Sequence, residues 1–267
     1  MSAQPMPEPL QTVLPALPQR LLAEFVGTLL LVCTVVGSGI MAQHLADGNV
    51  ALMLLANTVA TVCILFVLIQ TLGPISGAHF NPVVTAVFGA ANGLLWSARL
   101  AYVGAQLAGA LAGVVLANLM FEHAPLEWAQ QVRSGPNLWL AEVLATAGLV
   151  FVIGRSCART APALVAAYIG AAMWFTASTS LANPAATFGR LFSDSFAGVA
   201  LSSFPALVAA QVAGGLLGAL LLRALRAPTA VAGAATGLAG ATIGDAAPGA
   251  RGGRLTQAAA SGEQVSP

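Results

Sequence analysis

Charged residues are scarce in this chain of 267 residues. Asp, Glu, Lys and Arg together make up 7% of it, whereas 58% of its residues are hydrophobic. A soluble domain has about 25% charged residues, so this chain lacks the charge to cover a surface that faces water. The composition therefore predicts an integral membrane protein whose surroundings are a lipid bilayer.

Lysine is absent, and the formal net charge is only +1. A nucleic-acid-binding protein needs a clustered basic face, so we expect no nucleic-acid partner. The three cysteines, Cys33, Cys63 and Cys157, have no paired spacing and predict neither a disulfide framework nor a metal site. No Ser/His/Asp set or pair of catalytic carboxylates is found near the middle of the apolar runs, so we expect neither an enzyme nor a cofactor.

The two ends of the chain lack long apolar runs. Residues 1–19 contain five prolines and no basic stretch of the kind that opens a signal peptide, so they predict a flexible N-terminal segment. Residues 225–267 are rich in Ala, Gly, Ser and Thr and contain no aromatic residue, which predicts a disordered tail.

Six apolar runs between these ends approach the length of about 20 residues that a spanning helix needs. They cover residues 20–42, 50–72, 98–120, 137–154, 162–181 and 203–224. If the N-terminus is inside, the outer segments hold only Arg133 and Arg190, and the other arginines fall on the inner side, as the positive-inside rule requires. We therefore expect a multi-pass protein of the inner (plasma) membrane with both termini in the cytoplasm.

The two halves of the chain resemble each other. "LLAEFVGTLLLV" matches "WLAEVLATAGLV" and aligns Glu24 with Glu142, and "AHFNPVVTA" matches "SLANPAATF" and aligns Asn81 with Asn183. Repeat one covers about residues 20–120 and repeat two about 137–224. Since each holds three spans, the second enters the membrane from the opposite side, which makes an inverted repeat.

An Asn-Pro pair occurs once in each repeat, in a segment too short to cross a membrane. Asn is a strong N-cap and Pro is favoured at the first helical position, so Asn81-Pro82-Val83 and Asn183-Pro184-Ala185 each predict the start of a short re-entrant helix. Two such half-helices would point their N-termini at the midplane. Each N-terminus carries roughly +0.5 of a unit charge, so together they would repel cations.

At this point the motifs "SGAHFNPVVTA", "ANPAATFG" and "AEFVGT" resemble the aquaporin (major intrinsic protein) family, over residues 20–224. The resemblance implies an all-α channel domain with six transmembrane helices and two half-helices, a homotetramer, and passage of water or small neutral solutes. Glu24 and Glu142 are predicted to be structural acids that accept hydrogen bonds from irregular re-entrant backbone. His79 is predicted at the inner pore mouth.

The family builds its selectivity filter from four positions, which counting along this chain places at Thr61, Ala171, Ser180 and Ala186. None of these side chains is large, and the filter arginine is missing. A wide pore of this kind favours solutes larger than water. The chain is similar to the bacterial branch associated with arsenic resistance, which implies metalloid hydroxides or organoarsenicals as solutes.

Several alternatives stay open. The channel could instead be selective for water or glycerol, and the buried acids could serve a coupled secondary transporter. Arg190 lies four residues after Ala186, where it could reach back and supply the missing charge, or it could be an outer-vestibule or lipid-interface residue near Asp194.

Overall fold

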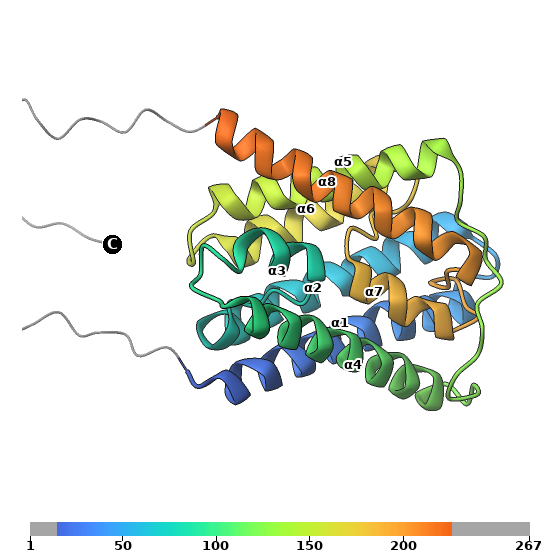
Figure 1. Cartoon of the computed structure of the whole chain (residues 1–267). Coiled ribbons are helices and arrows are strands. Elements are labelled where there is room, and N and C mark those ends of the chain that lie inside the picture. The colour runs from blue at the N-terminus through green and yellow to red at the C-terminus, as the bar shows by residue number, and fades with distance from the viewer. Residues whose placement is uncertain (1–14, 226–267) are drawn as a thin grey trace, which may run out of the picture. The chain divides into compact units, whose positions relative to one another are not determined.

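The computed structural model describes residues 15–225, and every regular element in this part of the chain is a helix (Figure 1). The first helix begins at Leu17, so the N-terminal segment predicted to be flexible as far as residue 19 is helical in its last three residues. The remainder of that segment, apart from residues 15 and 16, lies outside the described residues, as does the predicted tail from residue 226 onward.

The elements follow the order that the two repeats predict. They are α1 (Leu17–Leu45), α2 (Val50–Ser76), the short α3 (Pro82–Phe88), α4 (Trp96–Met120), α5 (Pro136–Arg155), α6 (Ala161–Phe175), the short α7 (Pro184–Gly189), the 3-10 helices η1 (Arg190–Phe192) and η2 (Leu201–Ser203), and α8 (Phe204–Ala224). Within the described part, five helical stretches are long and apolar enough to cross a membrane: α1, α2, α4, α5, and η2 with α8.

The sixth predicted span covers residues 162–181, and the predicted C-terminal end of its helix is wrong. Helix α6 has 15 residues and ends at Phe175, because the chain leaves helical geometry there. Thr179, Ser180 and Ala182 have positive φ angles of 60°, 52° and 45°, which no α-helix contains. The residues after Phe175 that were predicted to be helical therefore form an irregular segment.

Small residues let the long helices pack closely in matching pairs. Helix α1 packs mainly against α4, and α5 mainly against α8. Gly109 and Gly113 of α4 lie against backbone carbonyls of α1, so that a Cβ atom at either position would collide with them. Gly214 and Gly218 of α8 do the same against α5. The repeated sequence thus gives a repeated helix contact.

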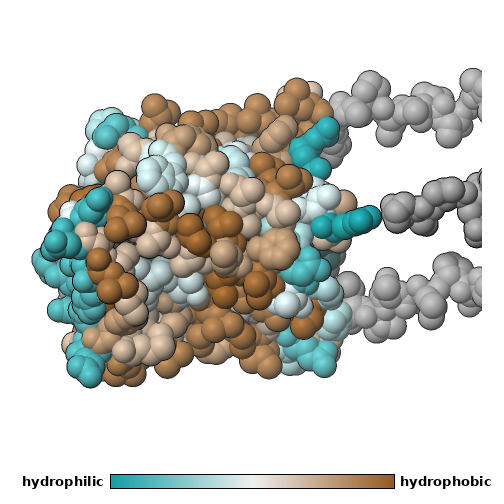
Figure 2. Space-filling model, turned by 180° about the vertical axis from the view of Figure 1, so that it is seen from behind, coloured by the Kyte–Doolittle hydropathy of each residue, from teal (hydrophilic) through white to brown (hydrophobic). Residues whose placement is uncertain are grey.

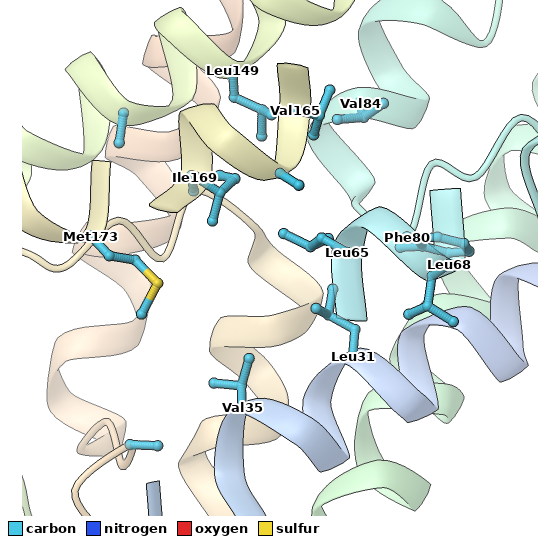
Figure 3. Close-up of a cluster of buried hydrophobic side chains, with 14 residues drawn as sticks. Leu31, Val35, Leu65, Leu68, Phe80, Val84, Leu149, Val165, Ile169 and Met173 are labelled. Atoms are coloured by element: carbon cyan, nitrogen blue, oxygen red, sulfur yellow. The ribbon is translucent and has the colours of Figure 1, made fainter. Parts of the chain in front are cut away.

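Other helix contacts join the two repeats. Helix α2 packs against α6, while α3 and α7 contact each other and both α4 and α8. Side chains from α1, α2, α3, α5 and α6 meet in one buried cluster that includes Leu31, Leu65, Val84, Leu149 and Ile169 (Figure 3). The start of α1 and the end of α8 lie at the same end of the helix bundle (Figure 1).

Hydrophobic residues cover the middle of the face in Figure 2, and hydrophilic residues gather at the two ends of the helices. Leu100, Leu140, Leu144, Leu216 and Leu220 are among the large side chains left exposed on the outer helix faces. A soluble protein rarely exposes such a band, whereas a lipid bilayer solvates it. The chain is therefore a multi-pass membrane protein.

Candidate functional site

The two Asn-Pro pairs begin the two half-helices. The Asn81 Oδ1 accepts a hydrogen bond from the Val83 N–H at 2.9 Å and caps α3. The Asn183 Oδ1 accepts from the N–H groups of Ala185 and Ala186 at 2.9 and 3.2 Å and caps α7. Both side chains therefore act as N-caps, with Pro in the first helical position.

The same two asparagines bind each other's loops. The Asn81 Nδ2 donates to the carbonyl of Ala182 at 2.8 Å, and the Asn183 Nδ2 donates to the carbonyl of Phe80 at 2.7 Å. An amide nitrogen carries two N–H donors. Each asparagine thus uses one N–H to hold the two half-helices together, and its second N–H can donate to an oxygen atom of a solute.

The loops before the half-helices have the same unusual backbone. Residues three and one before each Asn, namely Ala78 and Phe80 in the first loop and Ser180 and Ala182 in the second, have φ between 45° and 52°. Left-handed geometry at a residue other than Gly is strained, and it persists only where surrounding contacts hold it. Here it turns the carbonyls of Phe80 and Ala182 toward the asparagine of the other repeat.

Glu24 and Glu142 supply those holding contacts. The Glu24 carboxylate accepts from the N–H groups of His79 and Phe80 at 2.9 and 2.7 Å, and also from Ser76 and Gln106. The Glu142 carboxylate accepts from the N–H groups of Leu181 and Ala182 at 2.9 and 2.8 Å, and from Gln211 at 2.7 Å. Both acids are fully buried, and these bonds support the structural role predicted for them.

A cavity of about 370 Å³ lies along the junction of the two half-helices. Predicted site residues on its wall are Thr61, His79, Asn81, Ser180, Asn183, Ala186 and Arg190. The Ser180 hydroxyl is buried and has no hydrogen-bond partner within the described residues. The Thr61 hydroxyl donates to the carbonyl of Asn57 at 2.7 Å, so it faces the cavity chiefly as an acceptor.

Ala171 was predicted to lie in the filter, and this is wrong. Its side chain is exposed on the outer face of α6 and does not line the cavity, whereas Ile169 and Met173 of the same helix do. Residues 169 and 173 are one turn apart and share a face, while residue 171 points the other way. The count back from Asn183 failed because the irregular segment after Phe175 separates the helix register from the motif.

The other residues of the Asn-Pro motifs pack away from the cavity. Val83 lies against Gly215 of α8, where a Cβ atom would collide with it. Ala185 belongs to a buried cluster with Ala110 of α4. A glycine on the opposing helix therefore accommodates the larger side chain at Val83. Pro82 and Pro184 occupy the first helical positions.

His79 is buried at the cavity wall and fixed by neighbours. Its Nδ1 lies 3.1 Å from the Thr85 hydroxyl, its Nε2 lies 3.3 Å from Asn92 Nδ2, and its ring lies 5.5 Å from that of Tyr102. Among residues 15–225, no group of His, Cys, Asp and Glu is arranged to hold a metal ion. His79 thus lines the cavity as a fixed polar group.

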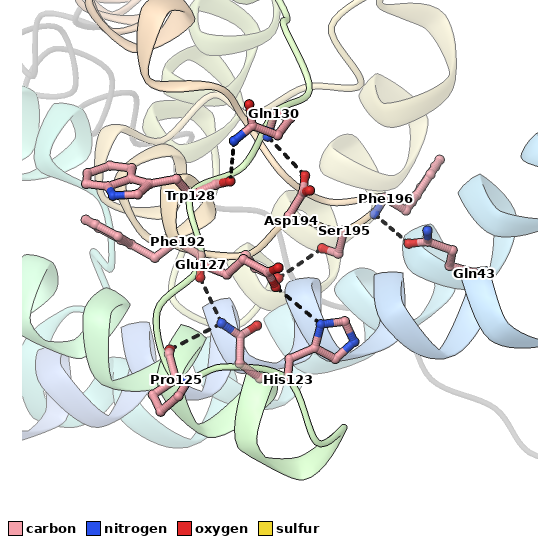
Figure 4. Close-up of polar contacts among 12 residues, drawn as sticks. Gln43, His123, Pro125, Glu127, Trp128, Gln130, Phe192, Asp194, Ser195 and Phe196 are labelled. Carbon is pink, nitrogen blue, oxygen red and sulfur yellow. Dashed lines mark hydrogen bonds and ion pairs between the residues drawn. The ribbon is translucent and has the colours of Figure 1, made fainter.

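Arg190 does not pair with Asp194. Its Nε donates to the carbonyl of Ala197, its side chain is 8% exposed, and it shares the cavity wall with Ala186. The Asp194 carboxylate accepts instead from the Gln130 N–H at 3.0 Å, among the loop contacts in Figure 4. Arg190 therefore forms no salt bridge with Asp194, and its role as a vestibule charge stays a prediction.

Sequence reasoning missed Asn57, Met173 and Arg133 among the residues near this site. Asn57 and Met173 line the cavity, and Arg133 reaches from the loop between α4 and α5 to the carbonyls of Phe196 and Gly198. Asn57 was detectable as an amide inside an apolar run. Arg133 had no such signal, because an arginine in a loop between apolar runs is ordinary.

Two half-helices that meet end to end inside a bundle, locked by reciprocal asparagine bonds and lining a cavity, define a channel with re-entrant helices. A family model described as major intrinsic protein matches residues 12–182, and the chain belongs to that family. It is therefore a membrane channel for small neutral solutes and not an enzyme.

Individual relatives agree with this assignment. The chain is 49% identical to aquaglyceroporin AqpS of Rhizobium meliloti over 215 residues, which cover 79% of this chain and 92% of that protein. It is 32% identical to the probable aquaporin NIP4-2 of Arabidopsis thaliana over 144 residues, 51% of this chain and 48% of that protein. The X-ray structure of the aquaglyceroporin from Plasmodium falciparum matches with a TM-score of 0.54 at 17% identity, covering 78% of this chain and 94% of that one.

Proposed function

We propose that this channel passively conducts uncharged solutes larger than water, with polyols, metalloid hydroxides and organoarsenicals as the candidate class. The observation that carries the proposal is the small size of Ala186 and Ser180 on the cavity wall beside the second half-helix. The free hydroxyl of Ser180 and the second amide donor of each asparagine replace part of the hydration that a solute rich in oxygen loses.

Ion exclusion in this proposal comes from desolvation and from the half-helices. An ion that enters the cavity loses hydration, and the described wall offers it no ring of carboxylates in exchange. The N-termini of α3 and α7 oppose a cation at the point where the two helices meet. A neutral solute meets neither cost.

Two observations bear on the alternatives. The name of the Rhizobium relative, an aquaglyceroporin, favours passage of solutes larger than water over strict water selectivity. A proton-coupled transporter needs an acid that gains and loses a proton in the cavity. Glu24 and Glu142 are instead fully buried, and backbone N–H groups occupy both of their carboxylates.

The test is a proteoliposome swelling assay with water, glycerol and uncharged arsenous acid side by side. In Ala186→Arg we expect the flux of the two larger solutes to fall at least about tenfold, and more than the flux of water, because the new side chain narrows the cavity. Ala91→Arg, in the exposed turn after α3, is the control and should leave all three fluxes unchanged. Equal losses for water and the larger solutes, or no loss, would contradict the filter assignment.

Assembly and orientation belong to the same proposal. Family membership supports a homotetramer with one pore per subunit, and the exposed leucines on the outer helix faces are suited to both subunit and lipid contact. The arginine distribution supports an inner (plasma) membrane location with both termini in the cytoplasm. Native mass spectrometry in mild detergent tests the tetramer.

A further inference from the structure

We propose that Arg190 supplies the fixed positive charge of the outer pore. It lies one helical turn beyond position 186, where Ala186 carries no charge. The inference rests on the proposed function and adds a specificity-determining residue to it. An arginine at position 186 would both exclude cations and narrow the pore. Arg190 excludes cations and leaves the pore wide beside Ala186.

The helix after the second Asn-Pro pair places Arg190 on the pore side. Helix α7 ends at Gly189 and continues directly as η1 from Arg190, so Ala186 and Arg190 are four residues apart on one face. Side chains on a helix lean toward its N-terminus, which here means toward the junction of the half-helices. Both residues accordingly line the same cavity.

A second arginine fixes the loop that holds Arg190. Three successive carbonyls take part: Ala197 accepts from Arg190 Nε, Phe196 from Arg133 Nη2 at 2.8 Å, and Gly198 from Arg133 Nε at 2.9 Å. The Val199 N–H then donates to the Arg190 carbonyl at 3.0 Å. The loop from Phe196 to Val199 is thus held by both arginines.

Neither arginine forms a salt bridge with a carboxylate of the described residues. The one ion pair among residues 15–225 joins His123 to Glu127, so no acid in the described chain lies within salt-bridge distance of either guanidinium. Backbone N–H groups already hold the Glu142 carboxylate. A charge without a salt-bridge partner in a site of low dielectric acts over several ångströms, so a cation that approaches Ala186 meets the field of Arg190.

The guanidinium also offers hydrogen bonds. An arginine has five N–H donors, and within the described residues only the Nε–H of Arg190 has a protein acceptor. The Nη groups remain for oxygen atoms of a solute in the cavity. Arg190 therefore favours neutral solutes that carry acceptor oxygens and rejects cations of the same size, without adding bulk beside Ala186.

Urea and guanidinium test this selectivity, since they are similar in size and shape and only guanidinium is charged. The test is to measure their fluxes at millimolar concentration in proteoliposomes, with water flux as the reference, for the wild type, Arg190→Met and Arg190→Gln. We expect the ratio of guanidinium to urea flux to rise at least about tenfold in both variants. Arg155→Gln, which removes an exposed charge at the end of α5, should keep the wild-type ratio.

A rescue distinguishes the charge from the loop that Arg190 anchors. In the double variant Ala186→Arg with Arg190→Met, the ratio of guanidinium to urea flux should fall back toward the wild-type value, because bulk at position 186 lowers both fluxes and only its charge lowers the ratio. An unchanged ratio in the single variants would overturn the inference, and so would loss of water flux in both, because Arg190 would then be only a structural anchor. If the wild type conducts water but not urea or glycerol, the proposed function fails, while guanidinium flux relative to water still tests Arg190.

Discussion

Met173 is the largest side chain that α6 contributes to the cavity wall near its C-terminal end, and it lies in the buried cluster of Figure 3. Methionine is unbranched and flexible, so it fills irregular space and yields to a solute more readily than a branched or aromatic residue. The width of the cavity on this side therefore depends on Met173 rather than on the exposed Ala171.

Replacing Met173 by Ala should widen the cavity and raise the flux of glycerol relative to water by at least about threefold, since three heavy atoms leave the wall. Ala171→Leu adds volume on the opposite face of the same helix and should leave the ratio unchanged. Stopped-flow light scattering of proteoliposomes measures both fluxes. A fall in glycerol flux in Ala171→Leu, with none of the expected rise in Met173→Ala, would return Ala171 to the filter.

Residue roles that depend on local rules were predictable from the sequence. An Asn followed by Pro favours the start of a helix, and an acid in an apolar run needs hydrogen-bond donors. These two rules predicted roles for Asn81, Asn183, Glu24 and Glu142 that match their observed bonds. Roles that depend on register across an irregular segment were not predictable. Ala171 failed for this reason, because the turns at Thr179 and Ser180 break the count.

At the scale of elements, the contact between α1 and α4 depends on the absence of side chains. Gly113 lies against the backbone carbonyl of Leu29, and backbone cannot move aside as a flexible side chain can. Gly104 of the same helix has no atom of a neighbouring element within 4 Å of its ideal Cβ position. Both glycines lie in α4, so they form a matched pair that differs only in what surrounds the Cβ position.

Gly113→Ala should therefore destabilise the folded protein by about 1–3 kcal/mol, as overpacking of a close contact does. Gly104→Ala should be neutral or slightly stabilising, because Ala favours a helix over Gly by about 1 kcal/mol. Thermal unfolding in detergent, followed by circular dichroism, compares the two midpoints with the wild type. Equal midpoints for both variants would show that the helices separate at no cost.

Element boundaries show where sequence patterns stop being informative. Hydrophobicity located the five long helical stretches and the shorter α6, because a bilayer demands apolar residues whatever backbone conformation they adopt. It extended α6 to residue 181, because the residues after Phe175 are small and mostly uncharged although their backbone is irregular. Composition reports the depth at which a segment lies, whereas backbone geometry depends on partners such as Glu142 that lie far away in sequence.

At the scale of the whole molecule, the orientation in the membrane decides which mouth of the pore carries Arg133 and Arg190. In the proposed orientation, which the arginine count supports, these two lie on the outer side and the turn between α5 and α6 lies on the inner side. Cys157 lies in that turn and is exposed, whereas Cys63 is exposed on the lipid-facing helix α2 and Cys33 is half-buried in α1. A polar reagent that cannot cross the membrane therefore reports on Cys157.

Labelling of Cys157 with a membrane-impermeant maleimide should succeed in inside-out vesicles and fail in intact spheroplasts. A hydrogen bond with the Thr160 hydroxyl, 3.3 Å from the sulfur, lowers the pKa of the Cys157 thiol. A lowered pKa gives more thiolate at neutral pH, so labelling should be faster than for an unperturbed thiol, and the advantage should shrink as pH rises above the ordinary thiol pKa.

Cys157→Ser removes the label, and adding Ser202→Cys, in the exposed η2, should restore it from the opposite side. Labelling of wild-type Cys157 in spheroplasts would invert the assigned orientation and place Arg190 at the cytoplasmic mouth.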